Sequence, residues 1–114
     1  MDLPSNFSKL IEQINNELDN LDHELSQTIE LVRLRIQLFP GNIILIQLFA
    51  TLNNYALFAE NTRRRIQETL QYLTIDEITL DQNIQEAGED FSEQLGRILE
   101  AKTVVSNIKN RLEN

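Results

Sequence analysis

The sequence of 114 residues contains no cysteine, no tryptophan, one histidine, three glycines and two prolines. Without cysteine the chain can form no disulfide bond, no zinc–thiolate site, no iron–sulfur cluster and no thiol nucleophile. One histidine excludes metal motifs that take two histidines from one chain, and no EF-hand spacing is present. Three scattered glycines form no phosphate-binding loop. We therefore expect no enzymatic activity, no metal site and no cofactor.

Basic residues are also scarce, with ten lysines and arginines against 18 acidic residues and a net charge of −8. This balance disfavours binding to a nucleic-acid backbone.

The first residues lack the basic and apolar regions of a signal peptide, so we expect a cytoplasmic protein. Residues 37–59 carry no charge. Because Pro40-Gly41 and several amide side chains interrupt this stretch, we expect a helix buried by protein on more than one side, and no contact with a membrane.

Apolar residues recur at alternating steps of three and four along nearly the whole chain, which is the helical period. Pro40-Gly41 is a strong turn signal, Thr74 to Glu77 has the spacing of a capping box, and Gly88 is a weaker break. The pattern predicts an all-α fold, an elongated antiparallel three-helix bundle with coiled-coil-like packing. We expect one domain over residues 1–114, with helices at about 5–38, 42–73 and 76–112. A break of the third helix near Gly88 stays open as an alternative.

The periodic apolar positions define one core stripe on each predicted helix. The stripe of the first helix comprises Phe7, Ile11, Ile14, Leu18, Leu21, Leu25, Ile29, Val32, Ile36 and Phe39. That of the second comprises Leu45, Leu48, Leu52, Tyr55, Ala59, Thr62, Ile66, Leu70 and Leu73. That of the third comprises Ile84, Ala87, Phe91, Leu95, Ile98, Ala101, Val105, Ile108 and Leu112.

The only basic cluster is Arg63-Arg64-Arg65, on a middle helix that lies between two acidic ones. Folding the chain about its two predicted turns brings carboxylates of both flanking helices beside the three arginines. The expected partners are Glu17, Asp19, Asp81 and Glu86. A structural role as counter-charge is therefore the favoured interpretation, and an anion contact with phosphate or nucleic acid is the alternative.

The single histidine lies in the sequence Asp-His-Glu-Leu-Ser-Gln-Thr-Ile at residues 22–29. His23-Glu24-Leu25 and the aliphatic Ile29 resemble the H-box of histidine-kinase dimerisation domains over these eight residues. The resemblance implies a phospho-accepting role for His23 on a helical hairpin that dimerises into a four-helix bundle. Thr28 stands where that family usually has proline, Ser26 stands where it usually has a basic residue, and no glycine-rich ATP-binding segment follows.

A second set of apolar residues lies outside the predicted core stripes. Because successive residues of a helix are rotated by about 100°, Leu31, Leu34 and Leu38 fall opposite the core stripe of the first helix. The second helix carries a further apolar stripe at the same end of the bundle. These candidate interface residues are Leu31, Leu34, Leu38, Ile43, Ile46, Ala50, Asn53 and Leu57. A third helix can cover one of the two sets, so the other is expected to form an apolar surface. A third helix that wraps further, or a closed four-helix monomer with a turn at Gly88, is the structural alternative.

These observations favour a non-enzymatic protein–protein interaction module, an oligomeric adaptor or regulator that forms a homodimer or binds a partner helix. A phosphotransfer or sensor-type helical domain with His23 as acceptor is the alternative. A small helical subunit of a nucleoprotein complex, touching RNA or DNA through residues 63–65, is the third and weakest interpretation.

Overall fold

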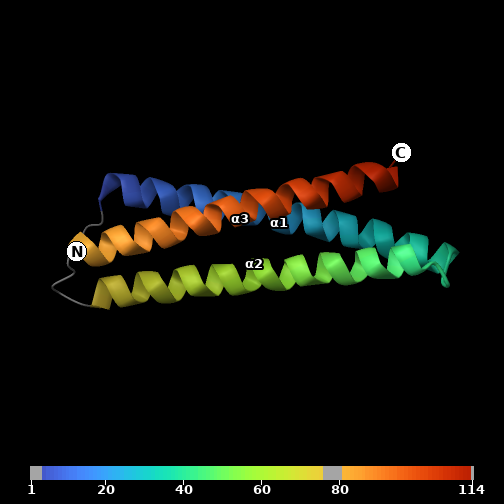
Figure 1. Ribbon diagram of the computed structural model, residues 1–114, viewed down its shortest axis with the longest axis horizontal. Helices are drawn as coiled ribbons and strands as arrows, with labels where there is room; N and C mark the ends of the chain where they lie inside the picture. Colours follow the sequence, from blue (N-terminus) through green and yellow to red (C-terminus); the bar gives the residue numbers. More distant parts are fainter. Residues whose placement is uncertain (1–3, 76–80, 114) are drawn as a thin grey trace.

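The computed structural model describes residues 4–75 and 81–113 of the chain. They form three helices, α1 (Ser5–Leu38), α2 (Ile43–Ile75) and α3 (Asp81–Glu113), and no strand occurs among them. The helices pack against one another as a rod of 58 × 21 × 16 Å, with α1 and α3 parallel and α2 antiparallel to both (Figure 1). The predicted all-α three-helix bundle is confirmed.

The turn between α1 and α2 is built from local hydrogen bonds. The Phe39 amide donates to the Arg35 carbonyl at 2.9 Å and completes the last turn of α1. Asn42 then caps α2, because its side-chain oxygen accepts a hydrogen bond from the Leu45 amide at 3.1 Å. Pro40 and Gly41 occupy the positions between these two caps, so the strongest turn signal of the sequence lies at the hairpin turn.

The predicted bounds of the first helix match α1, and α2 extends to Ile75, beyond the predicted end at residue 73. α3 is described from Asp81, so the predicted start at residue 76 lies outside the described residues. The capping box predicted at Thr74 to Glu77 extends into residues outside the described ranges. The break considered at Gly88 is wrong, because α3 runs through this residue without interruption. One glycine costs a helix only about 1 kcal/mol, which packing of α3 on α1 offsets.

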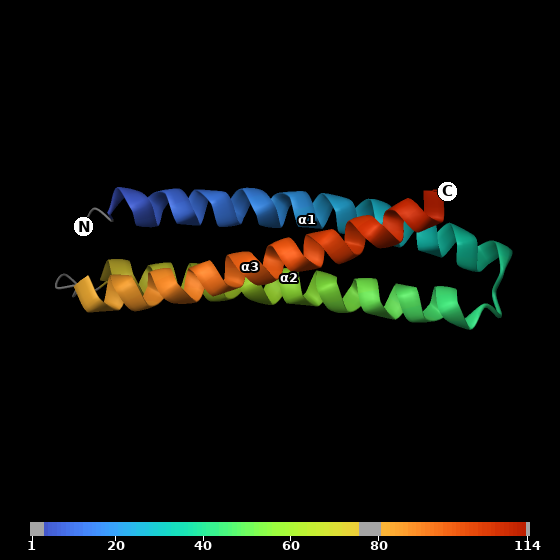
Figure 2. The same ribbon diagram turned by 45° about the horizontal axis from the view of Figure 1, so that its top comes forward.

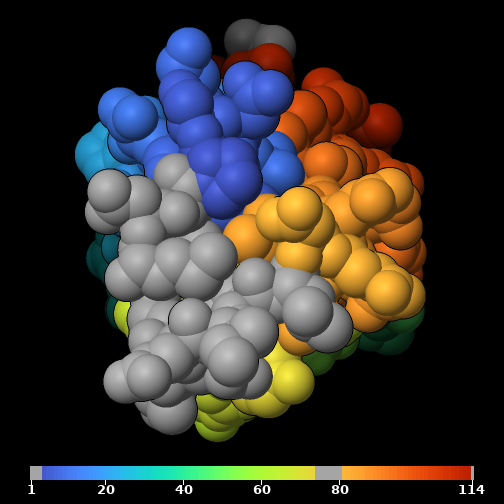
Figure 3. All heavy atoms as spheres, turned by 90° about the vertical axis from the view of Figure 1, so that its left-hand side faces the viewer, coloured from blue at the N-terminus to red at the C-terminus, as the bar shows by residue number. Residues whose placement is uncertain are grey.

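Every predicted stripe contributes to a single core that runs along the rod. The largest fully buried side chains are Ile14, Leu18, Leu21, Thr28, Val32, Leu52, Ile66, Phe91, Ile98 and Val105. The Phe91 ring stacks on Phe7 at 5.5 Å between centroids, near the end of the rod where the first parts of α1 and α3 adjoin (Figure 3). Phe39 was expected in the core and is 56% exposed, since it follows the last residue of α1.

Two buried polar side chains were not part of the predicted stripes. The Thr28 hydroxyl donates to the Glu24 carbonyl at 2.6 Å, one turn earlier on α1, and so is satisfied within its own helix. Gln94 is buried on α3. Among the described residues, no buried side-chain nitrogen or oxygen lacks a hydrogen-bond partner. The polar positions therefore enter the core without an unpaired group.

Polar contacts fix the register of α3 on α1. Lys102 pairs with Glu17 at 3.0 Å and Lys109 pairs with Glu24 at 3.5 Å. At the end of α3 the Arg35 guanidinium donates to the carbonyl of Leu112. α3 thus stops beside Arg35, and the α1–α2 hairpin continues past it (Figure 2).

α3 also diverges from α2 along its length. It starts close to the end of α2 and finishes against α1, as the two ribbon views together show (Figures 1 and 2). α2 and α3 share the smallest helix–helix contact of the bundle. Thr51, Tyr55 and Phe58 still line a groove with α3, so it is the first turns of α2, before Thr51, that have α1 as their main neighbour.

We expect Phe91→Ala to cost about 3–5 kcal/mol of unfolding free energy, because it removes a fully buried ring and leaves a cavity against Phe7. Leu99→Ala on the same helix is the matched control. Its side chain is 41% exposed, so its cost should be about 0.5 kcal/mol. Urea unfolding followed by circular dichroism measures both. Equal costs would contradict the core assignment.

Candidate interaction surface

Most of the predicted interface residues lie on the surface of the bundle. The large aliphatic members are exposed by 48% (Leu34), 70% (Leu38), 68% (Ile43), 48% (Ile46) and 55% (Leu57). Ala50 and Asn53 are exposed as well. Leu31 differs, because it is half-buried against the core and lines a groove with Lys109 of α3. α3 therefore covers the start of the α1 leucine series and leaves its end uncovered.

Two further apolar side chains join this surface that the helical pattern did not assign to it. Phe39 is 56% exposed and Ile44 is 67% exposed. Ile44 lies on the side of α2 that faces α3 further along the bundle, at about 100° from Ile43. It is exposed because α3 has diverged and stopped before reaching it. The signal that could have identified Ile44 was the length of the third helix relative to the hairpin.

Five positions of α2 form one continuous line, which we call the outward stripe. They fall within an arc of about 80° on the side away from the buried Leu45 and Leu52. The outward stripe comprises Ile43, Ile46, Ala50, Asn53 and Leu57. The Asn53 amide nitrogen donates to the Phe49 carbonyl at 2.9 Å, so this donor is satisfied within α2. The stripe thus presents four apolar side chains and one carbonyl oxygen to the exterior.

α2 is long and apolar enough, by length and composition, to cross a membrane over Ile43–Leu73, with a mean hydropathy of 1.3 in its most apolar window. Only 17% of that window is buried inside the bundle. The expectation that this helix is buried by protein on more than one side is therefore wrong within the single chain. Its apolar character is left unexplained by the intramolecular core alone.

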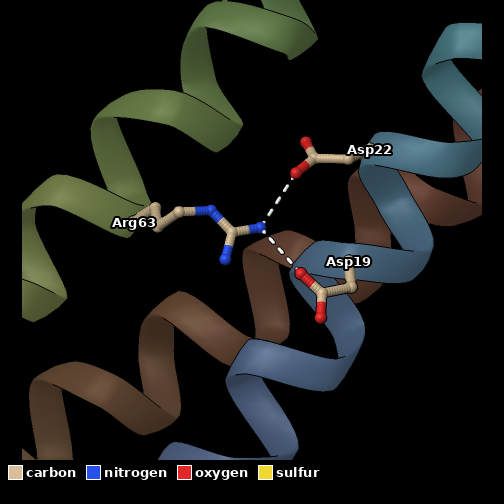
Figure 4. Close-up of polar contacts among 3 residues, drawn as sticks. All are labelled: Asp19, Asp22 and Arg63. Carbon is tan, nitrogen blue, oxygen red and sulfur yellow. Dashed lines mark hydrogen bonds and ion pairs between the residues drawn. The ribbon is translucent and has the colours of Figure 1, made fainter.

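The basic cluster is engaged with carboxylates of both flanking helices. Arg63 reaches α1 and donates to Asp22 at 2.8 Å and Asp19 at 3.2 Å (Figure 4). Arg65 reaches α3 and pairs with Asp90 at 2.7 Å. Arg64 donates to Asn61 on its own helix. Two of the three arginines thus form ion pairs between α2 and its neighbouring helices, which supports the structural interpretation of the cluster.

The expected partners of the arginines are correct only in part. Asp19 is a partner, but Glu17 pairs with Lys102 of α3 instead. Asp81 and Glu86 do not pair with the arginines, and the α3 carboxylate that reaches Arg65 is Asp90, further along the helix. Glu86 instead accepts a hydrogen bond from Gln82 on its own helix.

His23 is exposed on α1 and lines an open groove between α1 and α3, beside Lys109 and Glu113. Within the described ranges no residue forms a hydrogen bond with its imidazole. A nucleophilic histidine is normally oriented by an acid or base partner. In that same part of the chain, no group of three or more histidine or acidic side chains could hold a metal ion.

Comparison of the chain with protein-family models, with curated proteins and with solved structures gives no significant match.

Arg63→Ala should lower the unfolding free energy by about 0.5–1 kcal/mol, because it removes two partly exposed ion pairs to α1. Arg64→Ala removes the same charge from the next position and should cost close to nothing, since Arg64 contacts its own helix. The difference should shrink at high salt, which screens exposed pairs. Thermal unfolding of both variants at low and high ionic strength measures it. A larger loss for Arg64→Ala would contradict the structural role of Arg63.

If the chain takes no part in phosphotransfer, incubation with acetyl phosphate should give no acid-labile, base-stable label. The expectation rests on the missing orienting partner of the His23 ring. A label on the wild type that disappears in His23→Ala would establish the phosphotransfer alternative. Phosphate analysis by intact-mass measurement at alkaline pH provides the readout.

Proposed function

We propose that the chain is a non-catalytic protein interaction module that binds a helix of another polypeptide through the apolar surface of its α1–α2 hairpin. The observation that carries the proposal is the low burial of α2, 17% of its most apolar window, although α2 packs against both α1 and α3. An amphipathic partner helix docking on this surface would supply the missing burial.

The size of the surface fits this role. Seven large apolar side chains near the hairpin end are each exposed by about half or more, namely Leu34, Leu38, Phe39, Ile43, Ile44, Ile46 and Leu57. A half-exposed leucine or isoleucine presents on the order of 100 Å² of apolar area. They lie on both helices and on more than one side of the hairpin end, and their summed area is several hundred Å², the range in which exposed apolar surface on monomeric proteins marks interaction sites.

A protein partner fits the polarity of the surface better than a lipid bilayer. A membrane-spanning helix needs about 20 predominantly apolar residues. The charge-free half of α2 instead carries four exposed polar side chains, Gln47, Thr51, Asn53 and Asn54. Hydroxyl and amide groups of this kind remain hydrated or pair with polar groups at the rim of a protein interface.

The charge distribution supports a protein partner over nucleic acid. The chain has a net charge of −8. Arg63 and Arg65 are neutralised by carboxylates of α1 and α3. The apolar surface itself carries no charge, so its binding should depend little on salt.

Replacing Ile46 by glutamate should abolish binding without unfolding the chain. Ile46 is 48% exposed, so the charge remains hydrated in the free protein but would be buried in a complex. Tyr72→Glu is the matched control, with the same added charge on a 63% exposed residue at the other end of α2. Circular dichroism checks the fold. Sedimentation velocity checks self-association, and affinity capture with mass spectrometry checks binding to other proteins.

We expect the wild type and Tyr72→Glu to capture the same partner protein or to self-associate to the same extent. We expect Ile46→Glu to do neither. Capture that is unchanged in Ile46→Glu would overturn it. Unfolding of Ile46→Glu would show that Ile46 belongs to the intramolecular core, and the assignment of the outward stripe would then be wrong.

A further inference from the structure

The outward stripe of α2 has a large aliphatic residue at each end and a small residue at its centre, with Ile46 on one side of the centre and the polar Asn53 on the other. Its positions are separated by steps of three and four residues, and Ala50 stands at its centre. Ile43 and Leu57, both large and exposed, lie seven residues to either side of Ala50. Two copies of this stripe laid against each other in opposite directions therefore place large side chains at both ends and a small one in the middle.

We propose that the occupant of the outward stripe is the same stripe of a second copy of this chain, with the two α2 helices packed antiparallel about a twofold axis near Ala50. This inference rests on the proposed function and names its partner. An alanine at the crossing point allows two helices to approach at the short end of the usual 8–10 Å range of interaxial distances. Such a contact is isologous and closes as a dimer.

The charges that follow the stripe favour the antiparallel direction. Glu60, Arg64 and Glu68 continue on the same outward side of α2, beyond Leu57. A parallel pair would set each of these residues opposite its own copy, and like charges that face each other are unfavourable. In the antiparallel pair centred on Ala50, residues 41–59 meet only one another. None of these residues is charged.

The net charge of the whole chain favours the same direction. Each copy carries a net charge of −8. A parallel pair would align two acidic rods side by side along their 58 Å length. The antiparallel pair overlaps only along the uncharged first part of α2, residues 43–57, and the two rods extend away from each other. The overlap of 15 helical residues spans about 22 Å and lies at the small end of specific interfaces, so we expect a Kd of about 1–50 μM.

The absence of cysteine allows a direct test by single-cysteine variants of the full chain. Ala50→Cys alone should give a covalent dimer with a short bis-maleimide reagent. Ile43→Cys alone and Leu57→Cys alone should give little, because the antiparallel pair separates each residue from its own copy. A mixture of Ile43→Cys and Leu57→Cys should give the cross-linked pair. Adding Ile46→Glu to Ala50→Cys should abolish the cross-link, and Tyr72→Glu should leave it unchanged.

Other results would overturn the inference in distinguishable ways. Self-links at Ile43 and Leu57 as strong as the link at Ala50 indicate a parallel pair. A chain that sediments as a monomer at about 50 μM and shows no cross-link has no second copy on the stripe. The proposed function then still holds if Ile46→Glu loses a different captured protein. A monomer that binds phosphatidylcholine vesicles, and loses this binding on Ile46→Glu, would overturn both proposals in favour of a lipid surface.

Discussion

The place where α3 stops determines which surfaces of this protein are exposed. α3 ends with the Leu112 carbonyl held by Arg35 of α1, and ion pairs such as Lys102–Glu17 keep it from sliding further. Within residues 4–75 and 81–113, the hairpin of α1 and α2 extends beyond this point and no third helix lies against it there. The uncovered leucines and isoleucines follow from this register, because the same residue types further along the rod are buried by all three helices.

In the bundle the polar contacts favour one register of the helices, whereas the apolar contacts drive their association. Interhelical ion pairs such as Arg63–Asp22 and Arg65–Asp90 lie at the surface and contribute little to stability individually. They nevertheless place opposite charges at the same position along the rod, and so disfavour other registers of the helices. The buried stripes supply the driving force for association of the helices. At the hairpin end, where no ion pair joins the described parts of α1 and α2, the register is set by the hydrogen-bonded turn and by buried side chains such as Val32 and Leu45.

The fold could be predicted from the sequence because the step of three and four residues persists through three long segments. Buried residues such as Val32, Leu52 and Ile98 all fall on the predicted stripes. The burial of Gln94 could not be predicted, since a polar residue gives no periodic signal. Asp81 and Glu86 were predicted beside the arginines, but Asp90 is the α3 partner, because the register between two helices depends on packing details that the periodic pattern does not contain. The exposure of the outward stripe of α2 was therefore predicted from the sequence. The exposure of Phe39 and Ile44 was not, because it depends on where α3 ends.

The central position of α1 has a consequence for the order in which the chain folds. α1 and α2 are joined by a short turn next to the Asn42 cap, so their first antiparallel contacts join residues that are close in sequence. Contacts of α1 with α3 join residues far apart in sequence, as in Lys102 to Glu17, which are separated by 85 positions. Closing so long a loop carries a larger entropic cost. We therefore expect contacts between helices that are neighbours in the chain, α1 with α2 and α2 with α3, to form before the contacts of α1 with α3.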